Sequence, residues 1–323
     1  MISSLVVPSA FQLTAVMTVA GAVLAVRAAV ARRVERAAAV GRRYDADGVI
    51  VGAEPFELVP PAGGVVVGRA LLLHGFGDTP QTLSYLAADL AARGWVVRVP
   101  LLPGHGRTLR EFARSRSGDW ISAARGELTA LRQRPNSGSS NSVTGSSGPV
   151  VLVGLSMGGA LATILAAESP DLASVALVAP YVSMPRRLRV FAWGSRVVGL
   201  FVPYIAGRGA RSIRDPAESA RNLAYGAATP RLVAELGMVV RQAQAALPAV
   251  TAPTLIVASH HDNRISPDAV ELTFARLGTP TKRLVWADDG AHILTVDYGH
   301  EAVNAVVGDW LIGSHASQAR VPG

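Results

Sequence analysis

Residues 150–159 read VVLVGLSMGG and give the strongest indication of the fold. An apolar run, Val150–Val153, leads into a Gly-x-Ser-x-Gly turn centred on Ser156, and a segment of small and apolar residues typical of a helix follows. A serine between a strand and a helix must adopt a strained backbone that lifts its hydroxyl above the sheet. Gly154 and Gly158 have no Cβ, so the two elements can approach each other closely. The stretch therefore predicts a nucleophilic serine at the edge of a sheet.

Further apolar runs of strand length lie on both sides of this stretch. They are nearly continuous in hydrophobicity, which is typical of strands that are covered on both faces. The candidate strands are Ala70–Leu73, Trp95–Val99, Val175–Val178, Thr254–Val257 and Arg283–Trp286, with an antiparallel pair near Val49–Val51 and Glu57–Val59. Helical patterns occur at residues 82–93, 119–132, 157–168, 267–276 and 301–311. This alternation predicts an α/β fold, with a mostly parallel sheet and helices on both faces.

Two segments interrupt the alternation. Residues 135–149 read PNSGSSNSVTGSSGP, and we expect a flexible Ser/Gly loop on the surface. Residues 181–247 separate two strands by far more than a simple crossover needs, so they predict an inserted helical lid. The expected organisation is an N-terminal segment (1–43), a core (44–180 and 248–313), a lid (181–247) and a frayed tail (314–323).

A serine is a poor nucleophile without a base, and His292 is the best candidate among seven histidines. His292 follows the last predicted strand and precedes the last predicted helix. Its loop therefore opens at the carboxyl edge of the sheet, where Ser156 also lies and where ligands bind in open α/β sheets. His260 and His261 lie one loop earlier and are the alternatives. We expect His292 to take the proton from the serine.

The base needs an acid to orient it, and Asp262 follows the predicted strand Thr254–Val257. Asp288 and Asp289 are nearer to His292 in sequence, but their position indicates a strand end and a turn. Asp268 falls in the first turn of a predicted helix, where a carboxylate compensates the helix dipole. We therefore expect Asp262 to complete a Ser–Asp–His triad.

The oxyanion that develops during acyl transfer needs two positioned N–H donors. The amide of Met157, directly after the nucleophile, is the first candidate. The second is the amide of Phe76, in the segment His74–Asp78 that follows the first predicted parallel strand. No metal or organic cofactor is required by this set of residues.

Composition excludes several functional classes. The 323 residues are 50% hydrophobic and 17% charged, which is too apolar for a disordered chain. With no cysteine, the chain has no disulfide, no cysteine nucleophile and no cysteine-bound zinc. The net charge is +8, but six arginines and one glutamate fall within the first 43 residues. Because the basic excess is not on the predicted globular body, nucleic-acid binding is not expected.

The N-terminal segment predicts membrane association. Residues 5–26 contain no charged side chain and would form a helix of about 33 Å, enough to cross a bilayer core. An arginine-rich flank follows, which by the positive-inside rule leaves the catalytic domain in the cytoplasm. A cleaved signal peptide, giving a secreted protein, is one alternative. A helix that packs on a soluble cytoplasmic protein or lies in the membrane interface is another.

Five segments, in order over residues 66–312, carry a family resemblance: HGFGD (74–78), LLPGHGRT (101–108), GLSMGG (154–159), PTLIVASHHDNRISP (253–267) and GAHILTVDYGHEAV (290–303). Together they resemble the α/β-hydrolase superfamily, more narrowly the serine carboxylesterases and monoacylglycerol-lipase-like hydrolases. The resemblance implies triad roles for Ser156, Asp262 and His292, and oxyanion roles for Phe76 and Met157. The acid loop departs from the family pattern, because Ser259 replaces its usual glycine.

The expected substrate is a small-molecule ester or lipid. Residues 190–205 are strongly apolar, and arginines surround them. Such a segment can pack on the core or line an acyl pocket, and its arginines can face solvent or anionic lipid headgroups. We therefore expect hydrolysis of carboxylic esters with a medium or long acyl chain through an acyl-enzyme. The alternatives are a thioesterase, amidase, carbon–carbon hydrolase or perhydrolase on the same triad, and a non-catalytic membrane-tethered binding protein.

Overall fold

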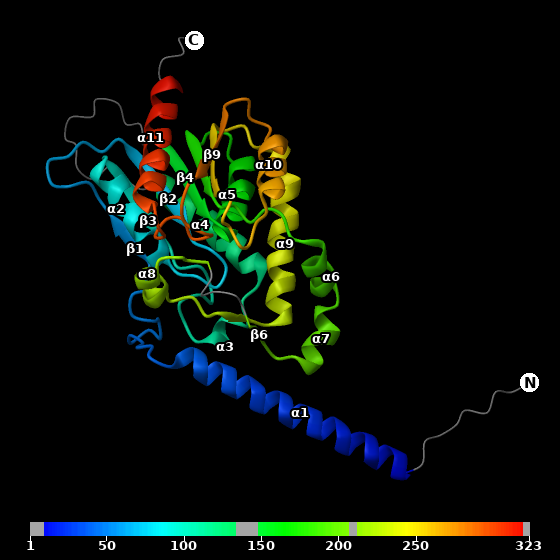
Figure 1. Ribbon diagram of the computed structural model, residues 1–323. Helices are drawn as coiled ribbons and strands as arrows, with labels where there is room; N and C mark the ends of the chain where they lie inside the picture. Colours follow the sequence, from blue (N-terminus) through cyan, green and yellow to red (C-terminus); the bar gives the residue numbers. More distant parts are fainter. Residues whose placement is uncertain (1–9, 134–147, 207–211, 319–323) are drawn as a thin grey trace, which may run out of the picture.

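The computed structural model describes residues 10–133, 148–206 and 212–318. Its main sheet has seven strands in the order β1-β3-β2-β4-β5-β8-β9 (Figure 1). The strands are β1 (Phe56–Leu58), β2 (Gly68–Leu73), β3 (Trp95–Val99), β4 (Val150–Leu155), β5 (Ser174–Val178), β8 (Thr254–Ser259) and β9 (Lys282–Ala287). Only β1 is antiparallel to its neighbour. The α/β prediction is confirmed.

Helices cover both faces of the sheet. On one face, α11 (His300–Gln318) packs against α2 (Ser84–Ala92). On the other, α5 (Met157–Ala167) packs against α4 (Ser117–Gln133), and α10 (Pro267–Arg276) lies beside β8. Every residue of β2, β5 and β8 is buried, which explains why these strands carry unbroken apolar runs.

The prediction that Val49–Val51 and Glu57–Val59 form an antiparallel pair with each other is wrong. β1 pairs with β3, with Phe56 opposite Val99, while Ile50 makes only an isolated bridge to Tyr44. Ile50 is nevertheless buried, and its amide donates to the carbonyl of Gly106 at 2.7 Å. Two short apolar runs close in sequence resemble a hairpin, but long-range pairing decided which of them joined the sheet.

The insertion between β5 and β8 is mainly helical. It contains α6 (Arg186–Trp193), α7 (Ser195–Phe201), α8 (Pro216–Arg221) and α9 (Pro230–Ala246), with a small ladder of β6 (Ile205–Ala206) and β7 (Ala227–Ala228). Thr229 caps α9 by accepting from the amide of Leu232 at 3.1 Å. α9 contacts α5 on one side and α6 and α7 on the other, so it joins the insertion to the core.

The N-terminal segment forms one long helix, α1 (Ala10–Ala39), which extends away from the body (Figure 1). No helix in the described part of the chain is long and apolar enough to cross a membrane, so the predicted transmembrane anchor at 5–26 is not supported. Residues 5–9 of that prediction lie outside the described part. So do residues 135–147 of the predicted Ser/Gly loop and the last five residues of the predicted tail, whereas α11 continues to Gln318.

Candidate active site

Ser156 occupies a strained turn between β4 and α5. Its φ of 56° and ψ of −116° lie in a region that residues with a side chain rarely adopt. Two hydrogen bonds hold the turn in place: the Ser156 amide donates to the carbonyl of Val178 at 3.0 Å, and the Tyr181 amide donates to the carbonyl of Ser156 at 2.9 Å. The turn is where the sequence pattern predicts it, and Ser156 is 7% exposed.

Gly158 is a position in this turn that tolerates no side chain. A Cβ on Gly158 would lie 1.9 Å from the carbonyl oxygen of Leu73 at the end of β2. We therefore expect Gly158→Ala to lower the free energy of unfolding by about 3 kcal/mol, as overpacking of a rigid core does. Urea unfolding followed by circular dichroism measures the change.

Gly126 provides the matched control. It lies on the exposed side of α4, and a Cβ added there would have no neighbouring atom within 4 Å, so Gly126→Ala should raise stability by about 0.5–1 kcal/mol. If Gly158→Ala unfolded at the wild-type urea concentration, the close approach of β2 and α5 would not matter for stability.

The structure brings His292 and Asp262 to Ser156. His292 Nε2 is 2.8 Å from Ser156 Oγ, and His292 Nδ1 is 2.8 Å from Asp262 Oδ2. All three side chains are almost fully buried. The carboxylate can only accept at Nδ1, so Nδ1 carries the ring proton and Nε2 is free to accept the serine proton.

Backbone amides hold Asp262 in place. Its Oδ1 accepts from the amides of Arg264 at 2.6 Å and Ile265 at 3.0 Å, while Oδ2 faces the imidazole. The loop thus satisfies the carboxylate that it buries, and it fixes which oxygen meets His292.

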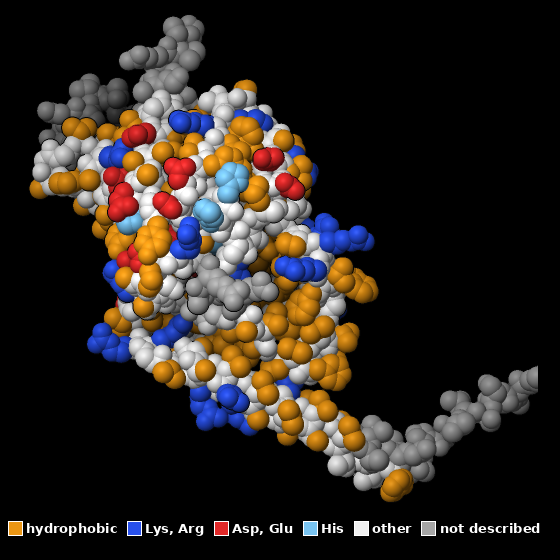
Figure 2. Space-filling view, viewed as in Figure 1, with side chains coloured by type: hydrophobic (Ala, Val, Ile, Leu, Met, Phe, Trp, Pro, Cys, Tyr) orange, Lys and Arg blue, Asp and Glu red, His pale blue; other side chains and the backbone are white. Residues whose placement is uncertain are grey.

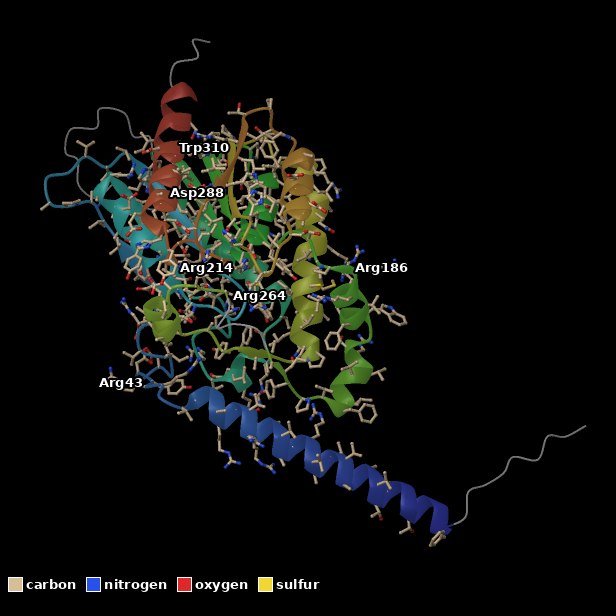
Figure 3. All side chains as sticks on the ribbon, in the orientation of Figure 1. Arg43, Arg186, Arg214, Arg264, Asp288 and Trp310 are labelled. Atoms are coloured by element: carbon tan, nitrogen blue, oxygen red, sulfur yellow. The ribbon has the colours of Figure 1, made fainter. Side chains whose placement is uncertain are left out.

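The alternative bases and acids lie elsewhere. His260 stacks on Trp286 with ring centroids 4.1 Å apart, and His261 is exposed. Asp268 is in the first turn of α10, as expected. Asp288 and Asp289 are exposed after β9 (Figure 3). None of these side chains contacts Ser156 in the hydrogen bonds of the described residues.

The two predicted oxyanion donors belong to elements that meet at Ser156. Met157 is the first residue of α5, so its amide lies at the positive end of the helix dipole. Phe76 lies in the loop after β2, where a Cβ added to the neighbouring Gly75 would be 3.3 Å from Ser156 Cβ. The Phe76 ring packs against Phe112 and Trp120, which fixes this loop.

Two buried histidines support the loop after β2 that carries Phe76, the second predicted oxyanion donor. His74 Nδ1 donates to the carbonyl of Gly75 at 3.0 Å, and its Nε2 accepts from the amide of Leu102 at 3.1 Å. Burial lowers the pKa of His74 to about 4, and burial also places the pKa of His105 well below its ordinary value. Both rings are therefore neutral near pH 7, and they pack edge to face with centroids 5.0 Å apart. His105 is thus a structural loop residue.

Sequence reasoning missed Asp78. This carboxylate is buried, its Oδ2 accepts from Thr82 Oγ1 at 2.7 Å, and it lies on the wall of the cavity beside Ser156. Burial raises the pKa of Asp78 to about 6, and the hydrogen bond from Thr82 opposes that rise. Asp78 was included in the segment His74–Asp78 that the sequence singled out, but its carboxylate was given no role.

A cavity of about 440 Å³ opens beside Ser156 and His292. Apolar side chains form most of its wall, including Phe76, Met184, Leu188, Ile205, Val233 and Leu236. Arg187 and Arg264 add positive charge; Arg264 is half-buried, whereas Arg186 is exposed and points outward from α6 (Figure 3). The volume is in the range typical of small-molecule sites.

Only part of the apolar segment at 190–205 reaches this cavity. Ile205 lines it, but Trp193, Leu200 and Phe201 are exposed to solvent. The rest of the apolar wall comes from several elements, among them the loop after β2, α6, α9 and the segment directly after β5. Among the described residues, no group of three or more His, Asp or Glu side chains is placed to hold a metal ion.

Comparisons with known proteins agree with this geometry. Residues 65–298 match the family model described as serine aminopeptidase, S33. A thermostable monoacylglycerol lipase from Bacillus sp. (strain H-257) is 28% identical over 250 residues, which cover 77% of this chain and 90% of the lipase. A carboxylesterase from Bacillus subtilis (strain 168) is 21% identical over 75% of this chain and 91% of its own length.

Solved structures give the same result. A structure from work on LipS and LipT, two metagenome-derived lipolytic enzymes, has a TM-score of 0.70 and 26% identity, covering 81% of this chain and 98% of its own. A soluble variant of monoglyceride lipase from Saccharomyces cerevisiae has a TM-score of 0.68 at 15% identity, covering 80% and 91% of the two chains. The second likeness is one of fold.

Proposed function

This chain belongs to the serine aminopeptidase S33 family and is a serine hydrolase of the monoacylglycerol lipase and esterase type, and we propose that it cleaves carboxylic esters with medium or long acyl chains. The observation that carries the proposal is the largely apolar cavity beside Ser156. An acyl chain is the part of an ester that such a wall binds, because each buried CH₂ contributes about 0.8 kcal/mol.

The charge of the cavity favours an ester over a peptide with a free N-terminus. Two arginines, Arg187 and Arg264, line the cavity against one carboxylate among its described lining residues, Asp78, whose Oδ2 accepts from Thr82. A substrate ammonium group would meet two positive charges there. A neutral or anionic alcohol, as in a monoacylglycerol or a lysolipid, meets no such repulsion.

In the proposed mechanism, Ser156 Oγ attacks the ester carbonyl carbon as His292 Nε2 takes its proton. Asp262 stabilises the imidazolium that forms and keeps the ring oriented. The amides of Phe76 and Met157 donate to the carbonyl oxygen as it becomes an oxyanion. The tetrahedral intermediate then collapses, His292 gives its proton to the leaving alcohol, and an acyl-enzyme remains on Ser156.

Hydrolysis of the acyl-enzyme completes the cycle, with water as the nucleophile in place of Ser156. His292 takes a proton from water, and the resulting hydroxide adds to the acyl carbon. The oxyanion again lies against the two amides. Collapse of this second intermediate returns the proton from His292 to Ser156 Oγ and releases the carboxylic acid.

We also propose that the chain is organised as the sequence indicates. Residues 44–180 and 248–313 form the catalytic core, and 181–247 serve as a lid over the acyl site, with 1–43 and 314–323 as terminal segments. The supporting observation is that Leu188 of α6 and Val233 of α9 both line the cavity that reaches Ser156.

The test is turnover of p-nitrophenyl esters of increasing chain length, with an acyl-CoA and a p-nitroanilide alongside. We expect kcat/KM for the octanoate and laurate esters to exceed that for the acetate by about tenfold or more. Val233→Trp should lower the laurate-to-acetate ratio, because the larger ring enters the acyl cavity. Leu272→Trp, exposed on α10, should leave the ratio unchanged.

Two results would sink the proposal. If the acetate ester were preferred over all longer esters, the proposed specificity for medium or long acyl chains would be wrong. Turnover of the thioester or the anilide without turnover of any oxygen ester would place the enzyme in a different substrate class.

A further inference from the structure

The outer half of α1 is apolar yet uncovered. Phe11, Met17 and Leu24 are 82%, 72% and 61% exposed, and no residue from Met1 to Val26 carries a charge. A helix without a polar face is normally buried in a core or in lipid, because its apolar surface is unfavourable in water. This stretch therefore indicates a covering surface outside the chain.

The inner half of α1 is fixed to the insertion. Arg27 Nε donates to the carbonyl of Gly199 in α7 at 3.0 Å, and Glu35 Oε1 accepts from the hydroxyl of Tyr204 at 2.8 Å. Val34 and Ala38 also pack against the core. These contacts set the direction in which the outer half of α1 leaves the body, relative to α7.

The insertion presents a second uncovered apolar surface beside α1. Trp193 at the end of α6 is 90% exposed, and Leu200 and Phe201 of α7 are 61% and 62% exposed. Figure 2 shows apolar side chains gathered over the insertion helices and along α1, which lies below them. We call the exposed apolar side chains of α6, α7, Phe11 and residues 17–26 of α1 the docking surface.

Positive charge borders the docking surface. Arg186, Arg189 and Arg196 are exposed on α6 and α7, and no acidic residue occurs from 186 to 206. Arg32, Arg33 and Arg36 lie on α1 directly after its apolar half. This combination matches a bilayer of anionic lipid. Its acyl region can receive the exposed apolar side chains, and its phosphates can pair with the surrounding arginines.

We propose that the docking surface binds an anionic phospholipid bilayer, with α1 lying in the headgroup region and α6 and α7 pressed against it. This arrangement requires no helix that crosses the membrane. It also orients the active-site cavity, because Arg187 and Leu188 of α6 line that cavity within one turn of the exposed Val190.

Co-sedimentation of the full-length protein with vesicles tests the proposal. We expect wild type to bind vesicles of equal parts phosphatidylcholine and phosphatidylglycerol, and to bind pure phosphatidylcholine far less. The double variant Trp193→Ser/Phe201→Ser should lower the affinity for anionic vesicles about tenfold or more. The pair Arg186→Gln/Arg189→Gln should reduce the preference for anionic lipid. Leu272→Ser, an exposed leucine on the distant α10, is the matched control and should bind as wild type does.

Separate readouts distinguish this proposal from the proposed function. Neither Trp193 nor Phe201 lines the cavity, so turnover of a water-soluble short-chain ester reports that the double variant is folded. Ser156→Ala should bind vesicles as wild type does, because the nucleophile is not on the docking surface. Vesicle binding therefore remains measurable whatever the substrate is.

Three outcomes would overturn the proposal. Wild type fails to bind anionic vesicles, or the Trp193→Ser/Phe201→Ser variant binds them as tightly as wild type. The third is a dimer in sedimentation equilibrium that this double variant dissociates and that excludes vesicle binding. That last result would make the docking surface an interface between two copies of this chain.

Discussion

Ser156→Ala is expected to lower kcat for ester hydrolysis by a factor of about 10⁴ or more, the scale seen when a triad nucleophile is removed. The variant keeps the turn, because the bonds that hold it use backbone atoms: the Ser156 amide to Val178 and the Ser156 carbonyl from Tyr181. Only the hydroxyl, 2.8 Å from His292 Nε2, is lost. A fluorophosphonate probe, which reacts with activated serines, should label wild type and leave the variant unlabelled.

Ser122→Ala is the control for that experiment. Ser122 is exposed on α4, so the variant should be labelled and should turn over esters as wild type does. An unlabelled wild-type protein, or residual labelling in Ser156→Ala, would show that Ser156 is not the activated serine.

Asp262→Asn is expected to lower kcat by about 10⁴ while the fold stays intact. The asparagine carbonyl can still accept from the amides of Arg264 and Ile265, which Asp262 Oδ1 accepts now. Its NH₂ group would replace Oδ2 opposite His292 Nδ1, and a donor there favours the tautomer that carries its proton on Nε2. That tautomer cannot take the proton from Ser156.

Steady-state kinetics and thermal unfolding together measure this effect. Asp268→Asn is the matched control, since Asp268 is an exposed carboxylate in the first turn of α10 and should alter kcat little. If Asp262→Asn kept kcat within about tenfold of wild type while Asp288→Asn or Asp289→Asn lost it, a different acid would orient His292.

The local sequence pattern was enough to predict the site residues that lie in loops directly after strands. Ser156, Asp262 and His292 each follow a buried or half-buried strand, and parallel strands bring their carboxyl ends to one edge. Strand order and loop position were therefore enough to expect the three side chains near one another. Asp78 was missed because its burial comes from the helix and loops that pack over it.

Apolar sequence patterns gave wrong predictions where long-range packing determines which segments pair and which side chains are buried. The segments 49–51 and 57–59 were expected to pair with each other, but β1 at 56–58 pairs with β3 and Ile50 makes only an isolated bridge to Tyr44. Trp193 and Phe201 lie in the apolar segment that could pack on the core or line the pocket, yet both side chains are exposed to solvent. Met184, Val233 and Leu236 lie in the cavity wall instead. Hydrophobicity predicts that a side chain will be buried, but it does not predict which surface will cover it.

The class of fold, the strand–turn–helix that carries Ser156, and the order of Ser156, Asp262 and His292 along the chain could all be predicted from the amino-acid sequence. These features follow from residue size and strand periodicity, which act over a few neighbours. Long-range packing sets which apolar surfaces are covered, which carboxylates are buried, and how α1 lies against the insertion through Arg27 and Glu35. Those last contacts join segments far apart along the chain, and no local pattern records them.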